Sequence, residues 1–285
     1  MPLHVKRTAH INQVVGDFEA AKEFYSRIFG AEIFWEKYDE PARRDAAMFM
    51  IGDTPIELFA PVDDTSLLGA GLNTFGESFH SFEWLVDDLA DAEDVFAAHG
   101  VRLTTHRPEQ GFFMTHPKDG HGILFEIYNG TNTDEPRDRP DWSDAPWRNG
   151  PLALHRLNAM GVAVRDLESA LAFFLSVSGG EIAYREHRAG IGHVAGVWVA
   201  DMMTELIQPD SDDSPVADFI TTMGPRIRSL DFKVADVDAV AAHFAGHGLR
   251  TARADCVADV LLDARDNFGV MYQFTERSLP SDPRD

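Results

Sequence analysis

The sequence predicts an α+β protein built from four copies of one β-α-β-β-β module, each of about 70 residues. Three observations lead to this fold class. The two halves of the chain repeat one another, and each half divides again on the same plan. Within each unit, an amphipathic helical pattern is followed by short runs with the composition of strands.

The repeat between the halves extends over most of their length. The run VVGDFEAAKEFYSRIFGAEI in the first half matches VAVRDLESALAFFLSVSGGEI in the second. The offset stays nearly constant at three paired positions: Asp17 and Asp166 (149 residues), Glu57 and Glu205 (148), and Glu126 and Gln273 (147). A constant offset of this kind indicates duplication of a whole structural unit.

The repeat within each half is visible in the first one. HINQVVGDFEAAKEFYSRIFGAEI and HSFEWLVDDLADAEDVFAAHGVRL each begin with a strand-like run led by His. An aspartate, Asp17 or Asp88, then stands where a helix N-cap is expected, and apolar residues follow at helical spacing. Runs such as EIFWEKY, AAMFMIG and PIELFAP then read as strands.

The middle of the chain has the composition of a linker. Residues 129–150 contain three prolines and many Asp and Asn residues, without a hydrophobic period. We therefore expect a first domain over residues 1–130, a linker over 131–151 and a second domain over 152–285. A second irregular stretch, the Gly-rich residues 61–78, is expected to be a long loop that could close over a site.

Composition limits the kinds of partner. Apolar residues make up 44% of the 285 residues and charged residues 25%, which is typical of a globular protein rather than a membrane protein. The formal charge of −22 argues against binding to nucleic acid or to anionic membranes. The single cysteine, Cys256, excludes an internal disulfide and fits the cytoplasm. We expect a small-molecule substrate and allow for a homodimer.

The repeated module, together with two local sequences, resembles the vicinal oxygen chelate superfamily. The sequences are FHSFEWLVDDLADAEDVFAAHGVRL and HPKDGHGILFEIYNG, and the similarity extends over residues 6–130 and 152–277. This superfamily includes glyoxalase I, methylmalonyl-CoA epimerase, fosfomycin and bleomycin resistance proteins and extradiol dioxygenases. The first half is most similar to its epimerase and glyoxalase-like members. The resemblance implies that two modules pair into a half-open barrel around one metal ion.

The resemblance also implies a set of metal ligands in the first half: His10, Glu57, His80 and Glu126. Each lies in a short apolar strand, where burial of an uncompensated charge would be costly. Mixed nitrogen and oxygen ligands suit one divalent ion per chain, namely Ni, Co, Mn, Fe or Zn. Alternation along a strand places His80 on one face with Phe82 and Trp84. The residues expected to contact the substrate are Asn12, Phe59, Phe82, Trp84 and Tyr128.

The second half has lost most of these ligands. The residues at the equivalent positions are Ala159, Glu205, Arg228 and Gln273. Arg228 would repel a metal and is expected to pair with Glu205, so we expect this half to support the first one structurally. Alternatively, Arg228 could fix a carboxylate or phosphate in a metal-free cleft. His187 and His193, in a Gly-rich stretch, are a weaker metal candidate.

For the activity, the resemblance implies proton transfer by an isomerase, epimerase or lyase acting on a small, partly apolar substrate with vicinal oxygens. Glu57 and Glu126 are then candidates both for metal ligand and for catalytic base. The first alternative is an Fe(II) dioxygenase of the extradiol type, with His10, His80 and Glu126 as a facial triad. The second is a metal-free binding protein of the bleomycin-resistance type. Epimerases commonly have Gln in place of Glu57, and no basic cluster marks a coenzyme A or glutathione site.

Overall fold

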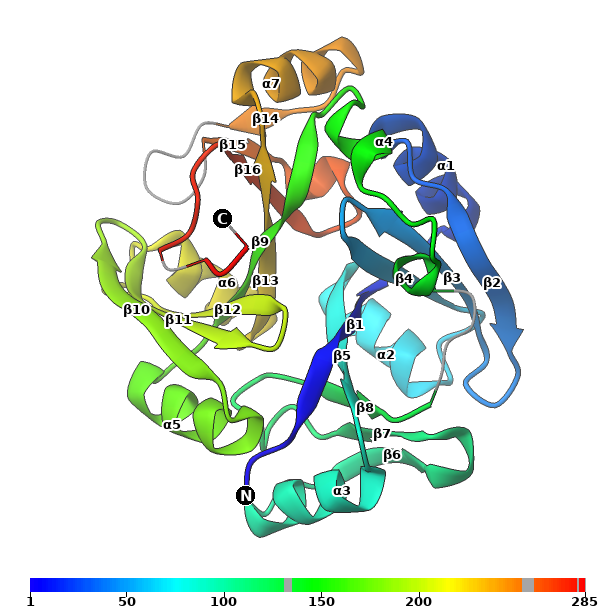
Figure 1. The fold of residues 1–285 in the computed structure, drawn as a ribbon, viewed down its shortest axis with the longest axis vertical. Coiled ribbons are helices and arrows are strands. Elements are labelled where there is room, and N and C mark those ends of the chain that lie inside the picture. Colours follow the sequence, from blue (N-terminus) through cyan, green and yellow to red (C-terminus); the bar gives the residue numbers. More distant parts are fainter. Residues whose placement is uncertain (131–134, 253–258, 281, 285) are drawn as a thin grey trace.

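The computed structural model describes residues 1–130, 135–252, 259–280 and 282–284 (Figure 1). Cys256 and part of the expected linker lie outside the described residues. Each half of the chain forms one curved sheet of eight strands, with helices packed on its outer side (Figure 1). The predicted α+β fold of four β-α-β-β-β modules is confirmed.

The first sheet has the strand order β2-β3-β4-β1-β5-β8-β7-β6. Its two modules meet where β1 pairs antiparallel with β5, while β1 runs parallel to β4 and β5 parallel to β8. The strands are β1 (Val5–Val14), β2 (Ile33–Asp39), β3 (Arg44–Ile51), β4 (Thr54–Pro61), β5 (Ser78–Val86), β6 (Leu103–Arg107), β7 (Phe112–Thr115) and β8 (Phe125–Tyr128).

The second sheet repeats this order as β10-β11-β12-β9-β13-β16-β15-β14. Here β9 pairs antiparallel with β13 and lies parallel to β12. Its strands are β9 (Leu154–Ala163), β10 (Glu181–Arg188), β11 (Gly192–Val199), β12 (Met202–Gln208), β13 (Arg226–Val234), β14 (Thr251–Ala252), β15 (Val260–Leu262) and β16 (Met271–Thr275). The matching topology is the structural counterpart of the sequence repeat.

Aspartates begin the module helices, as the sequence predicts. The side chain of Asp17 accepts a hydrogen bond from the amide of Ala20, and that of Asp166 accepts one from the amide of Ser169. Asp88 caps a third helix in the same way. The helices are α1 (Phe18–Phe29), α2 (Leu67–Phe75), α3 (Leu89–Ala98), α4 (Ala145–Arg148), α5 (Leu167–Ser178), α6 (Pro215–Met223) and α7 (Val237–Gly246). None of the described helices is long and apolar enough to cross a membrane.

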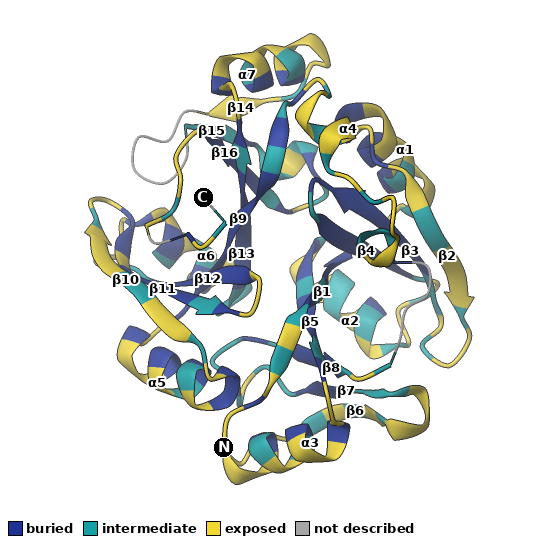
Figure 2. Ribbon diagram, viewed as in Figure 1, coloured by how far each residue is buried: buried dark blue, intermediate teal, exposed yellow. Residues whose placement is uncertain are grey.

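The hydrophobic core continues from one half into the other. The ring of Phe174 on α5 lies 5.6 Å from that of Trp84 on β5, and the ring of Phe29 on α1 lies 5.6 Å from that of Tyr272 on β16. Figure 2 shows the strands largely buried and the outer helix faces exposed. Each sheet is therefore covered partly by a helix of the other half, which holds the two sheets in a fixed arrangement.

Two glycines allow the halves to approach closely. A Cβ added to Gly122 would lie 2.2 Å from the carbonyl oxygen of Pro225, and one added to Gly269 would lie 1.8 Å from that of Glu77. Both glycines have positive φ, which most other residues rarely adopt. They belong to the matching sequences HPKDGHGILFE and DARDNFGVMYQ, so the duplicated glycine serves a pair of symmetry-related contacts.

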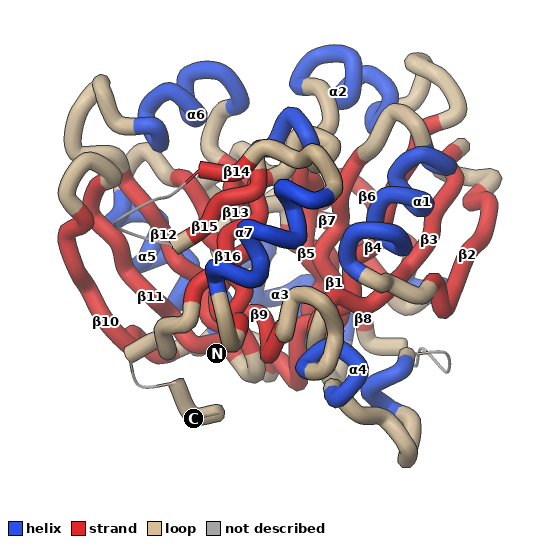
Figure 3. Tube along the Cα trace, turned by 90° about the horizontal axis from the view of Figure 1, so that it is seen from above, coloured by secondary structure: helices blue, strands red, loops and turns tan. Residues whose placement is uncertain are grey.

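The stretch expected to be a loop over residues 61–78 contains helix α2, so its Gly-rich composition was misleading. Ser66 caps this helix by accepting a hydrogen bond from the amide of Gly69. Gly69 must be small because its added Cβ would lie 2.0 Å from the carbonyl oxygen of Asp63. α2 and α6 lie at the same side of the molecule, opposite α4 (Figure 3).

Candidate metal centre

Four strands of the first sheet bring one imidazole and three carboxylates together. His10 lies on β1, Glu57 on β4, Glu83 on β5 and Glu126 on β8, and all four are buried. The sheet register explains this grouping, because His10 is paired with Glu83, and Glu83 with Glu126, on adjacent strands.

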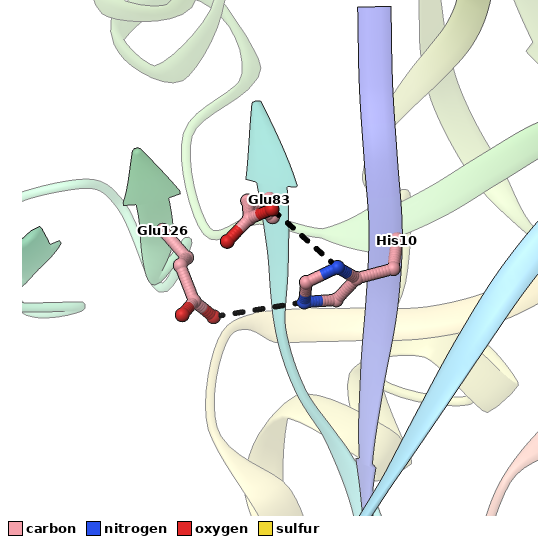
Figure 4. Close-up of side chains that lie close together, drawn as sticks. All are labelled: His10, Glu83 and Glu126. Carbon is pink, nitrogen blue, oxygen red and sulfur yellow. Dashed lines mark ion pairs between the residues drawn. The ribbon is translucent and has the colours of Figure 1, made fainter. Parts of the chain in front are cut away.

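Different carboxylates face the two nitrogens of the His10 ring. Its Nε2 atom lies 3.0 Å from Glu57 Oε2 and 4.0 Å from Glu126 Oε2. Its Nδ1 atom lies 3.5 Å from Glu83 Oε1. Figure 4 shows Glu83 and Glu126 approaching the ring from β5 and β8. The ring therefore has two carboxylates on one nitrogen and a third on the other.

Burial and mutual repulsion perturb these groups. Desolvation, opposed by His10 and reinforced by Glu126 and Glu57, raises the pKa of Glu83 to about 8. Desolvation also raises the pKa of Glu126. For His10, desolvation would lower the pKa, but the three carboxylates outweigh it and raise it to about 10. Three buried carboxylates around one imidazole leave an excess of negative charge.

The donor set fits a divalent cation, which would compensate that charge. His10, Glu83 and Glu126 offer ligand atoms that lie within 4.8 Å of one another. The Nε2 atom of His10 lies near Glu57 Oε2 and Glu126 Oε2, so these three atoms together could hold an ion. Glu83 lies at the opposite nitrogen, where a carboxylate would orient the imidazole if Nε2 bound a metal.

Asn12 and Ser81 support the cluster from the same face of the sheet. The Nδ2 atom of Asn12 donates to Glu126 Oε2 at 2.8 Å and to Ser81 Oγ at 2.7 Å. Ser81 Oγ also lies 2.9 Å from His80 Nδ1. Asn12, expected to bind substrate, thus fixes the carboxylate of Glu126, and a chain of hydrogen bonds connects His80 to the cluster.

His80 itself lies outside the described cluster. The pairing of β1 with β5 shifts at this point, because Asn12 faces Ser81 whereas Gln13 faces Phe79, so His80 is the extra residue of a bulge. Its ring contacts Phe59 at 5.8 Å. Burial and the nearby Arg44 and Arg226 lower the pKa of His80 to about 3, so the ring is neutral.

The same bulge changes which aromatic residues face the cluster. Phe82 and Trp84 lie on the opposite face of β5 from Glu83 and are fully buried in the core. Simple alternation along β5, counted from His80, predicts that both rings point into the barrel. It also predicts that Glu83 points away from the barrel, because the bulge at His80 shifts the alternation by one residue. An acidic residue between Phe82 and Trp84 in an apolar strand was the available signal for Glu83.

Phe59 and Tyr128 do lie near the cluster. Phe59 is two residues from Glu57 on β4, and the guanidinium of Arg44 lies 3.4 Å from its ring centre. Tyr128 lines a cavity of about 310 Å³ together with His10 and Glu83. The pair His10 and Glu83, which face each other across Nδ1, therefore lines this cavity.

The equivalent region of the second sheet is closed by its own side chains. Arg188 on β10 donates from Nη1 to Glu205 Oε2 at 2.7 Å, and Tyr184 donates to the same carboxylate. Glu205 thus pairs with Arg188, a partner that the comparison of the two halves does not predict. Gln273 donates to Asp231, the residue equivalent to Glu83, and burial raises the pKa of Asp231 to about 7.

The weaker metal candidate is a pair on the surface. The rings of His187 and His193 lie 4.9 Å apart, and His187 Nε2 lies 2.7 Å from Asp210 Oδ2. Both histidines are exposed. Within the described residues, they form no group of three potential ligands.

Comparisons with known proteins agree with this architecture. Residues 9–123 match the family described as the Glyoxalase/Bleomycin resistance protein/Dioxygenase superfamily. The uncharacterized protein YqjC of Bacillus subtilis is 23% identical over 128 residues, which are 43% of this chain and 91% of that protein. A 4-hydroxymandelate synthase variant from Streptomyces coelicolor has the same fold, with 14% identity and a TM-score of 0.73 over 99% of this chain and 96% of that one.

A single-domain structure matches only part of the chain. Methylmalonyl-CoA epimerase of Streptomyces coelicolor is 30% identical, covering 45% of this chain and 96% of its own, with a TM-score of 0.41.

Proposed function

Because this chain belongs to the glyoxalase/bleomycin resistance/dioxygenase superfamily, we propose that it is a metal-dependent enzyme that catalyses proton transfer at carbon. The reaction is an isomerisation, epimerisation or lyase reaction on a small, partly apolar substrate with vicinal oxygens. The buried group of one imidazole and three carboxylates in the first sheet is the observation that carries this proposal.

His10, Glu57 and Glu126 would hold one divalent ion on the Nε2 side of the imidazole. Bound there, the ion would supply Lewis-acid stabilisation of negative charge on a substrate oxygen. Glu83 would accept a hydrogen bond from Nδ1–H of His10 and thereby select the tautomer that leaves Nε2 unprotonated. The second sheet, whose acidic residues are already paired, would act as a scaffold.

The two carboxylates near Nε2 differ in how they are held. Glu126 accepts a hydrogen bond from Asn12, which keeps its orientation fixed. Glu57 contacts His10 and, within the part of the chain that the structure describes, has no such amide partner. This difference supports Glu126 as the permanent ligand and Glu57 as the group that takes and returns the substrate proton.

The composition of the cluster favours proton transfer over oxygen activation. The proposed dioxygenase triad requires His10, His80 and Glu126 around one ion. Among the described residues, His80 instead contacts Ser81 and Phe59, and the group near His10 contains carboxylates as its other members.

The test is incorporation of solvent deuterium into a panel of α-hydroxy ketones and acyl thioesters by the metal-loaded protein. We expect Glu57→Gln to bind the metal and lose exchange, whereas Glu126→Gln should lose the metal as well. Glu32→Gln, at an exposed position, is the matched control. Oxygen uptake with a catechol, or the absence of exchange from every substrate of the panel, would contradict the proposal.

A further inference from the structure

A second, larger cavity lies where the two halves of the chain meet. Its volume is about 670 Å³, within the range of sites for small organic ligands. The first half contributes one face of α2, the start of β5 and the segment before β8. The second half contributes Arg165 and the end of α6 with the start of β13. The close contact of Gly122 with Pro225 forms part of its wall.

The charge of this cavity is opposite to that of the whole protein. The chain carries 47 acidic and 25 basic residues, yet the described residues that line the cavity include neither Asp nor Glu. They include three basic residues and three histidines: Lys118, Arg165, Arg226, His80, His116 and His121. A local excess of positive charge in an acidic protein favours an anionic ligand.

Arg226 is the innermost of these cations. It is half-buried, its guanidinium lies 4.2 Å from the ring centre of Phe75, and Nη1 donates to Ser78 Oγ at 3.4 Å. Its buried Nε atom has no hydrogen-bond partner, and no carboxylate lies within ion-pair distance, among the described residues. Burial lowers the pKa of Arg226, consistent with the lack of a compensating charge. A buried guanidinium without a counter-ion is costly, and a ligand anion would compensate it.

The opposite wall of the cavity is apolar. Leu68, Gly71, Leu72 and Phe75 follow the i, i+3, i+4, i+7 spacing of one helical face on α2. Phe75 is 40% exposed, although it carries a large apolar ring. The cavity therefore combines an apolar wall with a cationic end, as an amphipathic ligand requires.

We propose that this cavity binds an organic carboxylate with an apolar body, with the carboxylate against Arg226 and the body along α2. Arg226 offers a planar pair of donors that suits a carboxylate. None of His10, Glu57, Glu83 and Glu126 lines the cavity, so this binding does not use the proposed metal ligands themselves.

Isothermal titration calorimetry with 4-phenylbutyrate and the uncharged 4-phenylbutan-1-ol tests this proposal, on the full chain with and without metal. The two probes share an apolar body and differ in the charged group. We expect one molecule of the carboxylate to bind per chain, and the alcohol to bind at least about tenfold more weakly. Removal of metal should leave this difference unchanged. Equal binding of the two probes, or no binding of the carboxylate at millimolar concentration, would overturn the proposal.

Two variants test the location of the site. Arg226→Gln should weaken carboxylate binding about tenfold or more, whereas Arg107→Gln, which removes a half-buried arginine near Phe112 away from the cavity, should have no effect. Gly71→Phe should block binding by placing a ring in the cavity from a position where the added Cβ itself meets no atom within 4 Å. Carboxylate binding that survives both Arg226→Gln and Gly71→Phe would show that the ligand binds elsewhere.

Discussion

The arginine that pairs with Glu205 in the second sheet offers a direct test of the charge balance in this half. Arg188→Met keeps the apolar stem and removes the guanidinium that pairs with Glu205. The Arg188 side chain is 11% exposed and that of Glu205 is 1% exposed, so the remaining carboxylate would stay buried near Asp231 after losing this cation. Loss of one partner of a buried ion pair costs about 3–5 kcal/mol. We expect a decrease of about 10 °C in the midpoint of thermal unfolding.

A neighbouring pair on the same strand provides the control. Arg185 pairs with Glu168, but both side chains are well exposed, and Arg185→Met should cost less than about 1 kcal/mol. The double variant Arg188→Met/Glu205→Gln removes the uncompensated charge and should recover much of the lost stability. If Arg188→Met costs no more than Arg185→Met, or if the double variant is no more stable than the single one, the guanidinium does not compensate Glu205 as described.

Three further predictions follow from the same structure. Because the folded state raises the pKa of Asp231 from 3.8 to about 7, the protonated form is favoured, and its contribution to stability is present below pH 4 and lost as the pH rises to 7. Asp231→Asn should therefore leave the free energy of unfolding, measured with urea, nearly unchanged at pH 4 and increase it by up to about 3–4 kcal/mol at pH 8. Equal effects at both pH values would refute this sign. His80→Ala should retain the metal, as measured by elemental analysis, since the ring lies outside the cluster; loss of the ion would make His80 a ligand. Gly122→Ala should lower the thermal midpoint more than alanine at the exposed Gly190, whose added Cβ meets no atom; equal losses would show that contact with Pro225 is unimportant.

Much of the architecture could be predicted from the sequence because duplication repeats local signals. The aspartate caps and the apolar spacing at Asp17 and Asp166 recur with a constant offset, so each copy supports the interpretation of the other. The helix within residues 61–78 is not predicted from the sequence, because the glycines of α2 serve close packing, as at Gly69, rather than a loop.

The site could be predicted only in part, for a geometric reason. His10, Glu57 and Glu126 come together because the pairings of β1 with β4 and of β5 with β8 run without a register shift. The bulge at His80 cannot be read from alternation, and it moves Glu83 rather than His80 towards the cluster. The pairing of Glu205 with Arg188 likewise depends on the approach of β10 to β12, which residue spacing does not specify.

The central claim is that the first sheet holds one divalent ion at His10, Glu57 and Glu126. Its most direct test is elemental analysis by inductively coupled plasma mass spectrometry of protein purified without added metal, alongside His10→Ala and the exposed control His4→Ala. We predict one divalent ion per chain in the unmodified protein and in His4→Ala, and none in His10→Ala. Two ions per chain, or one ion that persists in His10→Ala, would contradict this assignment.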